Sequence, residues 1–278
     1  MPRTGRPQPS GGGLRLVSRT EFLTILSTVA RRGILASMSA SKSRIEQNLQ
    51  RIRQNIAAAC IKSGRRMDEV AIVAVTKSAD LDGIKAAMEL GLTDLGESRV
   101  AQMAERAAEI AAWLERRKTE GPAAPRWHMI GHLQRNKVNQ VLDVADMIHS
   151  VDSLRLAEDI NDRASRRGRV ADILLQVNCS QEPQKFGCAV GAAPHLAELL
   201  STLSNIRLVG LMTMAEQSDD PNTSRPAFAL LRELFDELRH HHVGGENFRH
   251  LSMGMSQDYQ VAVEEGATLL RIGTAIFG

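Results

Sequence analysis

Aromatic side chains are scarce in this chain. One tyrosine, two tryptophans and six phenylalanines make up 3% of its 278 residues. Proteins that bind single-stranded nucleic acids stack the bases on aromatic side chains set among basic ones. No basic stripe with interleaved aromatics occurs here, so we expect no nucleic-acid partner.

Cysteine is equally rare, and long apolar runs are missing. The three cysteines, Cys60, Cys179 and Cys188, are an odd number and include no Cys-x-x-Cys pair. Such usage favours reduced thiols in a cytoplasm-like compartment over a disulfide framework. No apolar stretch reaches the roughly 18 residues that a membrane-spanning helix needs. The sequence therefore predicts a cytoplasmic protein with no membrane partner.

Charge is unevenly distributed between the N-terminus and the rest of the chain. Residues 1–37 carry six arginines and one glutamate, hence +5, and the formal total of +3 leaves −2 for the other 241 residues. The segment's glycines and prolines favour disorder. Its arginine-rich, acid-poor composition also fits an organelle presequence, and a start at Met38 is a third possibility. We interpret 1–37 as a disordered or misassigned extension and 38–278 as the folded domain.

Strand-like and helical patterns alternate through the rest of the chain. An amphipathic helix is predicted from Ser41 to Ser63, because apolar residues recur there at three- and four-residue spacing. Eight apolar runs then read as strands: Ala71–Thr76, Asp94–Gly96, Trp127–Ile130, Met147–Val151, Ala171–Val177, Leu208–Met214, His250–Met253 and Leu269–Ile272. Helical patterns separate them: Asp80–Leu90, Arg99–Lys118, Gln134–Val144, Ser153–Arg167, Ala193–Leu203, Arg225–His241 and Gln257–Glu265.

This alternation predicts the fold. Short loops between strands and helices imply right-handed crossovers and a parallel sheet. Eight such units in about 210 residues fit a closed barrel better than an open doubly wound sheet. No Gly-x-Gly-x-x-Gly follows the first strand, which argues against a dinucleotide-binding fold. We predict an α/β protein with a single (β/α)8 TIM-type barrel preceded by an N-terminal helix.

Lys77 ends the first strongly apolar run of the chain. Seven small or β-branched residues precede it, as in a strand buried on both faces. In α/β barrels the chemistry lies at the carboxyl ends of the strands. An amine that is partly desolvated there has a lowered pKa and attacks carbonyls. Taken alone, Lys77 is more simply a surface lysine that caps a strand, so a role in chemistry depends on what faces it.

Two late segments have the features of a phosphate site. Gly254 permits a tight turn, and Ser256 stands where the N-cap of the helix Gln257–Glu265 belongs, with free amide groups beside it. The last strand ends in Gly273-Thr274, which leaves room for close backbone approach and offers a hydroxyl donor. In barrels, the loops after the seventh and eighth strands most often bind phosphate.

A phosphate-bearing aldehyde bound through a lysine imine suggests pyridoxal 5′-phosphate (PLP). Arg271 on the last strand is then informative, because arginine is only a donor and keeps its proton in proteins. Against the pyridine nitrogen it would hold that nitrogen unprotonated, whereas PLP enzymes that use the ring as a strong electron sink place an aspartate there. A salt bridge at the barrel mouth is the alternative for Arg271.

Seven segments in chain order resemble one known family. They are Val73–Lys77, Gly96–Arg99, Trp127–Lys137, His149–Ser153, Gly210–Met214, Leu251–Asp258 and Arg271–Gly278. From about Ser41 to the last residue the chain resembles the pyridoxal phosphate homeostasis proteins. These are single-domain barrels similar to the N-terminal domain of alanine racemase.

The resemblance implies a PLP imine on Lys77, phosphate contacts from Ser256 and the Gly273-Thr274 turn, and Arg271 facing the ring nitrogen. It implies a protein that buffers PLP or transfers it to PLP-dependent apo-enzymes, with no established turnover reaction, and we expect it to act as a monomer. One departure is Ser98, which replaces the asparagine of the family's Gly-Glu-Asn-Arg. The side-chain amide of that asparagine cannot contact the cofactor ring here, although the Ser98 hydroxyl can make such a contact instead.

Two enzymes remain as alternatives. An amino-acid racemase needs a second base, which racemases take from a tyrosine of a separate β-rich domain, and the only tyrosine here is Tyr259 in the Gln257–Glu265 helix. A lysine-imine aldolase tends to carry its lysine later in the barrel and is colourless without substrate. No metal is expected, because the three histidines His240–His242 point in different directions on a helix and more simply complement its dipole.

Overall fold

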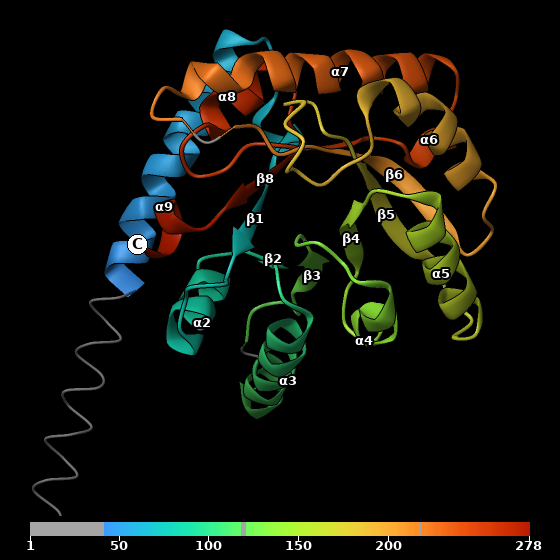
Figure 1. Ribbon diagram of the computed structural model, residues 1–278. Coiled ribbons are helices and arrows are strands. Elements are labelled where there is room, and N and C mark those ends of the chain that lie inside the picture. Colours follow the sequence, from blue (N-terminus) through green and yellow to red (C-terminus); the bar gives the residue numbers. More distant parts are fainter. Residues whose placement is uncertain (1–41, 118–120, 217) are drawn as a thin grey trace, which may run out of the picture. The chain divides into compact units, whose positions relative to one another are not determined.

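The short apolar runs form the strands of a closed parallel barrel. The computed structural model describes residues 42–117, 121–216 and 218–278. Within them the strands pair in chain order, and β8 closes the ring against β1 (Figure 1). The bounds are β1 Ala71–Val75, β2 Asp94–Glu97, β3 Arg126–Met129, β4 Met147–Val151, β5 Ala171–Gln176, β6 Ile206–Met212, β7 His250–Ser252 and β8 Leu269–Ile272.

A helix follows each strand. These helices are α2 Leu81–Glu89, α3 Val100–Arg117, α4 Val138–Leu142, α5 Leu154–Ser165, α6 Ala193–Ser201, α7 Arg225–His240, α8 Tyr259–Glu264 and α9 Thr274–Phe277. Local chemistry sets the start of α2, where the side chain of Asp80 accepts a hydrogen bond from the amide of Gly83 at 2.7 Å. A short acidic side chain fills this capping role well.

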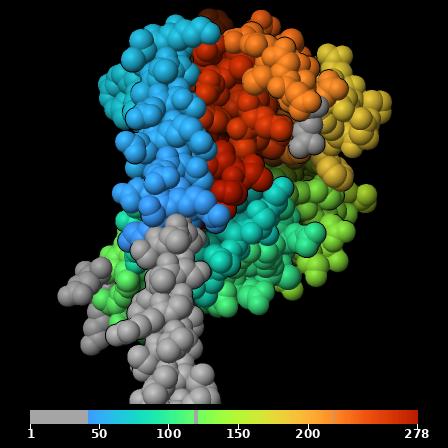
Figure 2. Space-filling model, turned by 90° about the vertical axis from the view of Figure 1, so that its left-hand side faces the viewer, coloured from blue at the N-terminus to red at the C-terminus, as the bar shows by residue number. Residues whose placement is uncertain are grey.

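The helix over residues 42–62 takes the place of the last outer helix. α9 has only four residues, too few to cover β8 and β1. Four apolar side chains of helix 42–62 are at most 2% exposed: Ile45, Leu49, Ile52 and Ile56. Its polar side chains reach the C-terminal segments, since Asn48 donates to the carbonyl of Ile276 and Asn55 donates to the Tyr259 hydroxyl. Figure 2 shows this helix, in blue, running along the red C-terminal segments.

The apolar core has two parts. The larger lies between the strands and the helices, as two-sided burial of a parallel sheet requires. The smaller takes its residues from β1, β4, β5, β6 and β8, which surround the barrel axis, so it fills the barrel interior. Its members are Val73, Met147, Leu174, Val209, Met212 and Leu269.

The predicted barrel is confirmed, and each strand ends within two residues of its predicted bounds. The helix expected over Gln134–Val144 is a 3-10 turn, η3 Arg135–Lys137, followed by the short α4. The helix α9 was not predicted, because Gly273-Thr274 was interpreted as the end of a strand and a loop. Residues 1–37 lie outside the described residues, so their interpretation as an extension stays a prediction.

Candidate functional site

The carboxyl ends of the strands surround a pocket of about 330 Å³. The five residues predicted to bind a cofactor all line it: Lys77, Ser256, Arg271, Gly273 and Thr274. Parallel strands bring their carboxyl ends to one end of a barrel. A lysine after β1 therefore faces residues that are almost two hundred positions away in the sequence.

Lys77 lies two residues beyond β1 and is exposed. The backbone of its turn is held by α3. Gln102 donates to the carbonyl of Lys77 at 3.2 Å, and the guanidinium of Arg106 donates to the carbonyls of Thr76 and Ala79. Lys77 is exposed and also lines the pocket, so the partial desolvation of its amine stays a prediction.

Arg106 is fixed in turn by Glu97 at the end of β2. The Glu97 side chain is fully buried, the Arg106 side chain is 13% exposed, and the two form an ion pair. Thr76 also donates its hydroxyl to Glu97 at 2.5 Å. Removing one partner of a buried ion pair costs about 3–5 kcal/mol. The pair is therefore a rigid link between α3, β2 and the turn that carries Lys77.

Ser256 has a different partner from the one predicted. The sequence placed it as N-cap of the following helix, but α8 begins only at Tyr259. The Ser256 hydroxyl oxygen instead accepts hydrogen bonds from the amides of Gly273 at 3.3 Å and Ala275 at 3.1 Å. The loop after β7 and the start of α9 therefore converge on one point of the pocket.

Gly254 and Asp258 shape the loop that carries Ser256. Gly254 has φ of +88°, and a Cβ there would lie 2.5 Å from the Cβ of Ala262. Gly254 thus adopts a backbone conformation that suits only glycine, shortly before the turn at residues 256–258. Asp258 accepts hydrogen bonds from the amide of Met255 at 2.6 Å and from the hydroxyl of Ser224 at 2.9 Å. These bonds hold the loop in place before α8 begins.

Arg271 is a buried cation at the bottom of the pocket. Its side chain donates to the Ser252 hydroxyl at 2.6 Å and to the carbonyl of Thr213 at 2.8 Å. Burial lowers the pKa of Arg271 to about 10, although the charge of Asp258 acts in the opposite direction. The group thus stays charged at neutral pH. No carboxylate of the described residues forms an ion pair with it, so the salt bridge considered from the sequence is not found, and the guanidinium suits an acceptor in the pocket.

Ser98, whose hydroxyl the sequence suggested as a ring contact, also lines the pocket. Five further lining residues were not predicted as ligand contacts: Val75, Ile130, Met214, Met255 and Gln257. Both methionines of this set lie at the pocket, whereas Met212 and Met253 are fully buried. His128 is buried inside the barrel.

Tyr259 does not line the pocket. Its side chain is 6% exposed, and its hydroxyl accepts a hydrogen bond from Asn55 of helix 42–62 at 2.8 Å. Because Asn55 lies on the outer helix, the tyrosine hydroxyl is directed away from Lys77. The geometry therefore offers no tyrosine base at the mouth.

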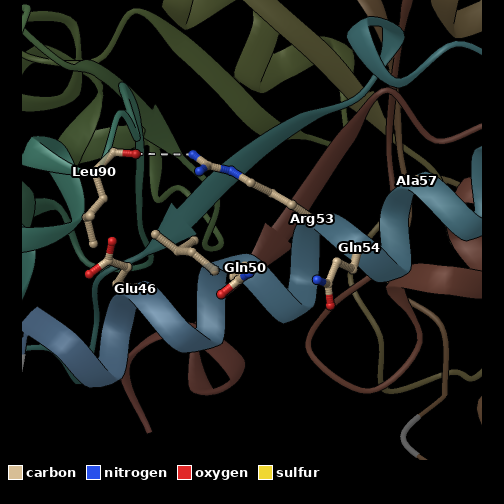
Figure 3. Close-up of a pocket in the computed structure, with 7 residues that line it drawn as sticks. Glu46, Gln50, Arg53, Gln54, Ala57 and Leu90 are labelled. Carbon is tan, nitrogen blue, oxygen red and sulfur yellow. Dashed lines mark hydrogen bonds between the residues drawn. The ribbon is translucent and has the colours of Figure 1, made fainter.

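A larger hollow, of about 540 Å³, lies on the outer surface between helix 42–62 and the end of α2 (Figure 3). Its rim is mostly exposed and polar, with Glu46, Gln50 and Gln54 on the helix. Arg53 crosses it and donates to the carbonyl of Leu90 at 3.1 Å. Because its polar groups project outward and do not converge on a point, the barrel mouth is the better candidate site.

Across residues 42–117, 121–216 and 218–278, no helix combines the length and the apolar character needed to cross a bilayer. The three cysteines, all within these ranges, are free.

Comparison with known proteins identifies relatives of the whole barrel. The family described as alanine racemase, N-terminal domain, matches residues 44–278. The pyridoxal phosphate homeostasis protein of Aquifex aeolicus is 36% identical over 233 residues, which are 84% of this chain and 96% of that protein.

Solved structures agree with this match. A protein of Bifidobacterium adolescentis, described as unknown, has a TM-score of 0.79 at 38% identity and covers 86% of this chain and 96% of its own. PipY of Synechococcus elongatus, solved with PLP bound, has a TM-score of 0.69 at 31% identity, covering 82% of this chain and 100% of its own. The chain therefore belongs to the pyridoxal phosphate homeostasis proteins, which are built on the alanine racemase N-terminal domain.

Proposed function

We propose that this protein binds PLP in the pocket at the barrel mouth and serves intracellular PLP homeostasis. Its relatives carry that function in their names, and one related structure holds PLP. The observation that carries the proposal is the meeting, in one pocket, of an exposed amine on Lys77 with the donor groups of the β7 and β8 loops.

The donors near Ser256 fit a phosphate. The amides of Gly273 and Ala275 already point to a single oxygen, that of the Ser256 hydroxyl. A phosphate oxygen beside this hydroxyl would meet the same two amides, and the exposed hydroxyl of Thr274 would add a further donor. A Cβ on Gly273 would lie 3.2 Å from the carbonyl oxygen of Val75, so the absent side chain lets this backbone pack against β1.

Arg271 fits the ring of PLP as a donor to the pyridine nitrogen. A guanidinium keeps its proton, so it would hold that nitrogen unprotonated. Enzymes that use the ring as a strong electron sink place a carboxylate there instead. The residues of this pocket therefore favour holding PLP over catalysing a turnover reaction.

Lys77 would hold PLP covalently as a reversible imine. Bound PLP supplies an aldehyde, to which amines add reversibly. The rigid link from Glu97 and Arg106 fixes the Lys77 backbone, while its side chain remains exposed. An incoming amine can reach the attachment point from solvent, which suits a protein that releases its ligand.

We further propose that the protein works as a cytoplasmic monomer that buffers PLP or transfers it to PLP-dependent apo-enzymes. The cysteines support a reducing compartment. Burial raises the pKa of Cys179 to about 11 and that of Cys188 to about 12, so both thiols stay protonated and unreactive.

Racemization is the weaker proposal for this pocket. It requires a base on each face of the bound substrate, and Tyr259 is held outside the pocket by its bond with Asn55. A lysine-imine aldolase would share the barrel lysine but would not give a coloured protein with PLP.

The test is absorbance of the purified protein after addition of PLP. We expect a visible yellow band that borohydride abolishes, that Lys77→Ala lacks, and that the matched variant Lys85→Ala keeps, since Lys85 lies on α2 and pairs with Asp82. A reducible band in Lys77→Ala, or no band in the unaltered protein, would contradict the proposal. Rapid formation of racemic alanine would favour a racemase instead.

A further inference from the structure

A chain of buried polar side chains crosses the inside of the barrel and ends at Arg271. Its members come from five strands: Asp94 on β2, His128 on β3, His149 on β4, Ser252 on β7 and Arg271 on β8. All are at most 5% exposed. The Asp94 carboxylate lies 2.8 Å from His128 Nε2, and His128 Nδ1 lies 2.9 Å from His149 Nε2. His149 Nδ1 lies 2.9 Å from the Ser252 hydroxyl, to which Arg271 donates at 2.6 Å.

The ionisation of the two ends and of His149 follows from their surroundings. Burial would raise the pKa of Asp94, but hydrogen bonds from His128 and Arg126 outweigh it and leave that pKa lowered. Burial above all holds the pKa of His149 well below its usual value, and the charge of Arg271 acts in the same direction. At neutral pH Asp94 is therefore ionised and His149 carries a single ring proton.

With a single proton on each ring, one direction along the whole chain satisfies these constraints. Arg271 can only donate and ionised Asp94 can only accept. His128 then directs an Nε2–H at Asp94, and its Nδ1 accepts from His149 Nε2–H. His149 Nδ1 then accepts from the Ser252 hydroxyl, whose oxygen accepts from Arg271. Every donor points away from the pocket, toward Asp94.

The space beside this chain inside the barrel is mainly apolar. Six apolar side chains, from Val73 to Leu269, fill the neighbouring space. A buried polar network that is only partly satisfied is less favourable than an apolar core. A chain in which each ring nitrogen is used, and which leads to a pocket residue, is therefore explained best by a task at Arg271.

We propose that Asp94, His128, His149 and Ser252 are positioning residues that hold the guanidinium of Arg271 in one orientation toward the pocket. This role rests on the proposed function, because the group that Arg271 would contact is the ring nitrogen of bound PLP. The hydrogen-bond chain itself belongs to the ligand-free protein, so it can be tested independently of PLP.

The direction of the chain is measured by ¹⁵N NMR of the histidine rings in ligand-free protein at neutral pH. We expect both His128 and His149 to be neutral with the proton on Nε2. In Asp94→Asn the new amide can donate to His128, because Arg126 remains beside it to occupy the oxygen. The ring protons should then move to Nδ1 on both histidines. His250→Gln, a matched change on β7 outside the chain, should leave both tautomers as they are.

The hold on Arg271 is measured by solvent exchange of its guanidinium protons in the same ligand-free protein. Ser252→Ala should speed this exchange at least tenfold and yet leave both histidines protonated on Nε2, because Asp94 still sets their direction. Ser252→Thr keeps a hydroxyl and should restore slow exchange. This pair of variants decides the matter even if Asp94→Asn does not fold.

Three results would overturn the positioning role. They are a charged or Nδ1-protonated histidine in the unaltered protein, tautomers that do not respond to Asp94→Asn, and unchanged Arg271 exchange in Ser252→Ala. With PLP present, Ser252→Ala should also weaken binding by about tenfold, or about 1.4 kcal/mol. If the unaltered protein binds no PLP, the proposed function fails, and the exchange data alone still decide whether Arg271 is held by this chain.

Discussion

Replacing Arg271 by methionine should separate ligand binding from stability. Burial lowers the pKa of Arg271 from its usual high value to about 10, and each pKa unit corresponds to about 1.4 kcal/mol. Keeping this cation desolvated therefore opposes folding by about 3 kcal/mol. Its hydrogen bonds to Ser252 and to the carbonyl of Thr213 stabilise the folded protein by about 1.5–3 kcal/mol each. Methionine loses these bonds but removes the desolvation cost and adds about 1.5 kcal/mol of apolar burial.

The terms nearly cancel, so we expect the unfolding free energy of ligand-free Arg271→Met to lie within about 2 kcal/mol of the unaltered protein. Urea unfolding followed by circular dichroism measures it. PLP affinity should fall at least tenfold or the absorption band should shift, because the donor to the ring nitrogen is gone. A stability loss above about 4 kcal/mol would make Arg271 a structural residue, and an unchanged affinity and spectrum would refute the ring-nitrogen role.

Three further predictions concern stability at low pH, Tyr259 and Gly254 in the loop after β7. Burial lowers the pKa of His250 to about 4, so stability should fall from pH 6.5 to 4 as the unfolded chain binds a proton that the folded protein does not. In urea unfolding, His250→Gln should flatten this slope by up to about 1.4 kcal/mol per pH unit, and an unchanged slope would contradict the assignment. Tyr259→Phe loses the hydrogen bond from Asn55, so the free energy of unfolding should fall by about 1 kcal/mol. The visible band of bound PLP should not change; a weaker band would place the tyrosine in the binding site. Gly254→Ala should lower the free energy of unfolding by about 2–4 kcal/mol, measured by thermal unfolding. Gly168→Ala, where a Cβ meets open space, should lower it by about 1 kcal/mol. Equal losses would show that the close contacts at Gly254 do not matter.

The barrel and its principal pocket residues could be predicted because both follow from order along the chain. Fully apolar runs such as Ala71–Val75 identify strands buried on two faces. Once eight of them alternate with helices, the topology alone brings Lys77 next to the loops after β7 and β8. No tertiary contact has to be known for that step.

The partner of Ser256 could not be predicted in the same way. A serine before a helical pattern has a local candidate, the amides of its own helix, and sequence reasoning chooses that one. In the structure, Asp258 holds the loop, and the serine reaches the amides of Gly273 and Ala275 on the next β/α unit. Only the closure of the barrel brings those amides within range.

The polar chain inside the barrel was beyond the sequence for a related reason. Asp94, His128, His149 and Ser252 lie on four different strands, and no spacing along the chain links them. Whether such side chains meet depends on the register of strand pairing and on which face each residue presents. The spacing of Glu97 and Arg106 was similarly uninformative, because one lies on a strand and the other on a helix.

The attachment of PLP to this barrel is tested most directly by peptide mass spectrometry of the protein after incubation with PLP and reduction with borohydride. We expect one phosphopyridoxyl adduct per chain, on the peptide that contains Lys77, with no adduct at Lys85 on the neighbouring helix. A principal adduct on any other lysine, or none at all, would contradict the claim that this barrel holds PLP through the residue that follows its first strand.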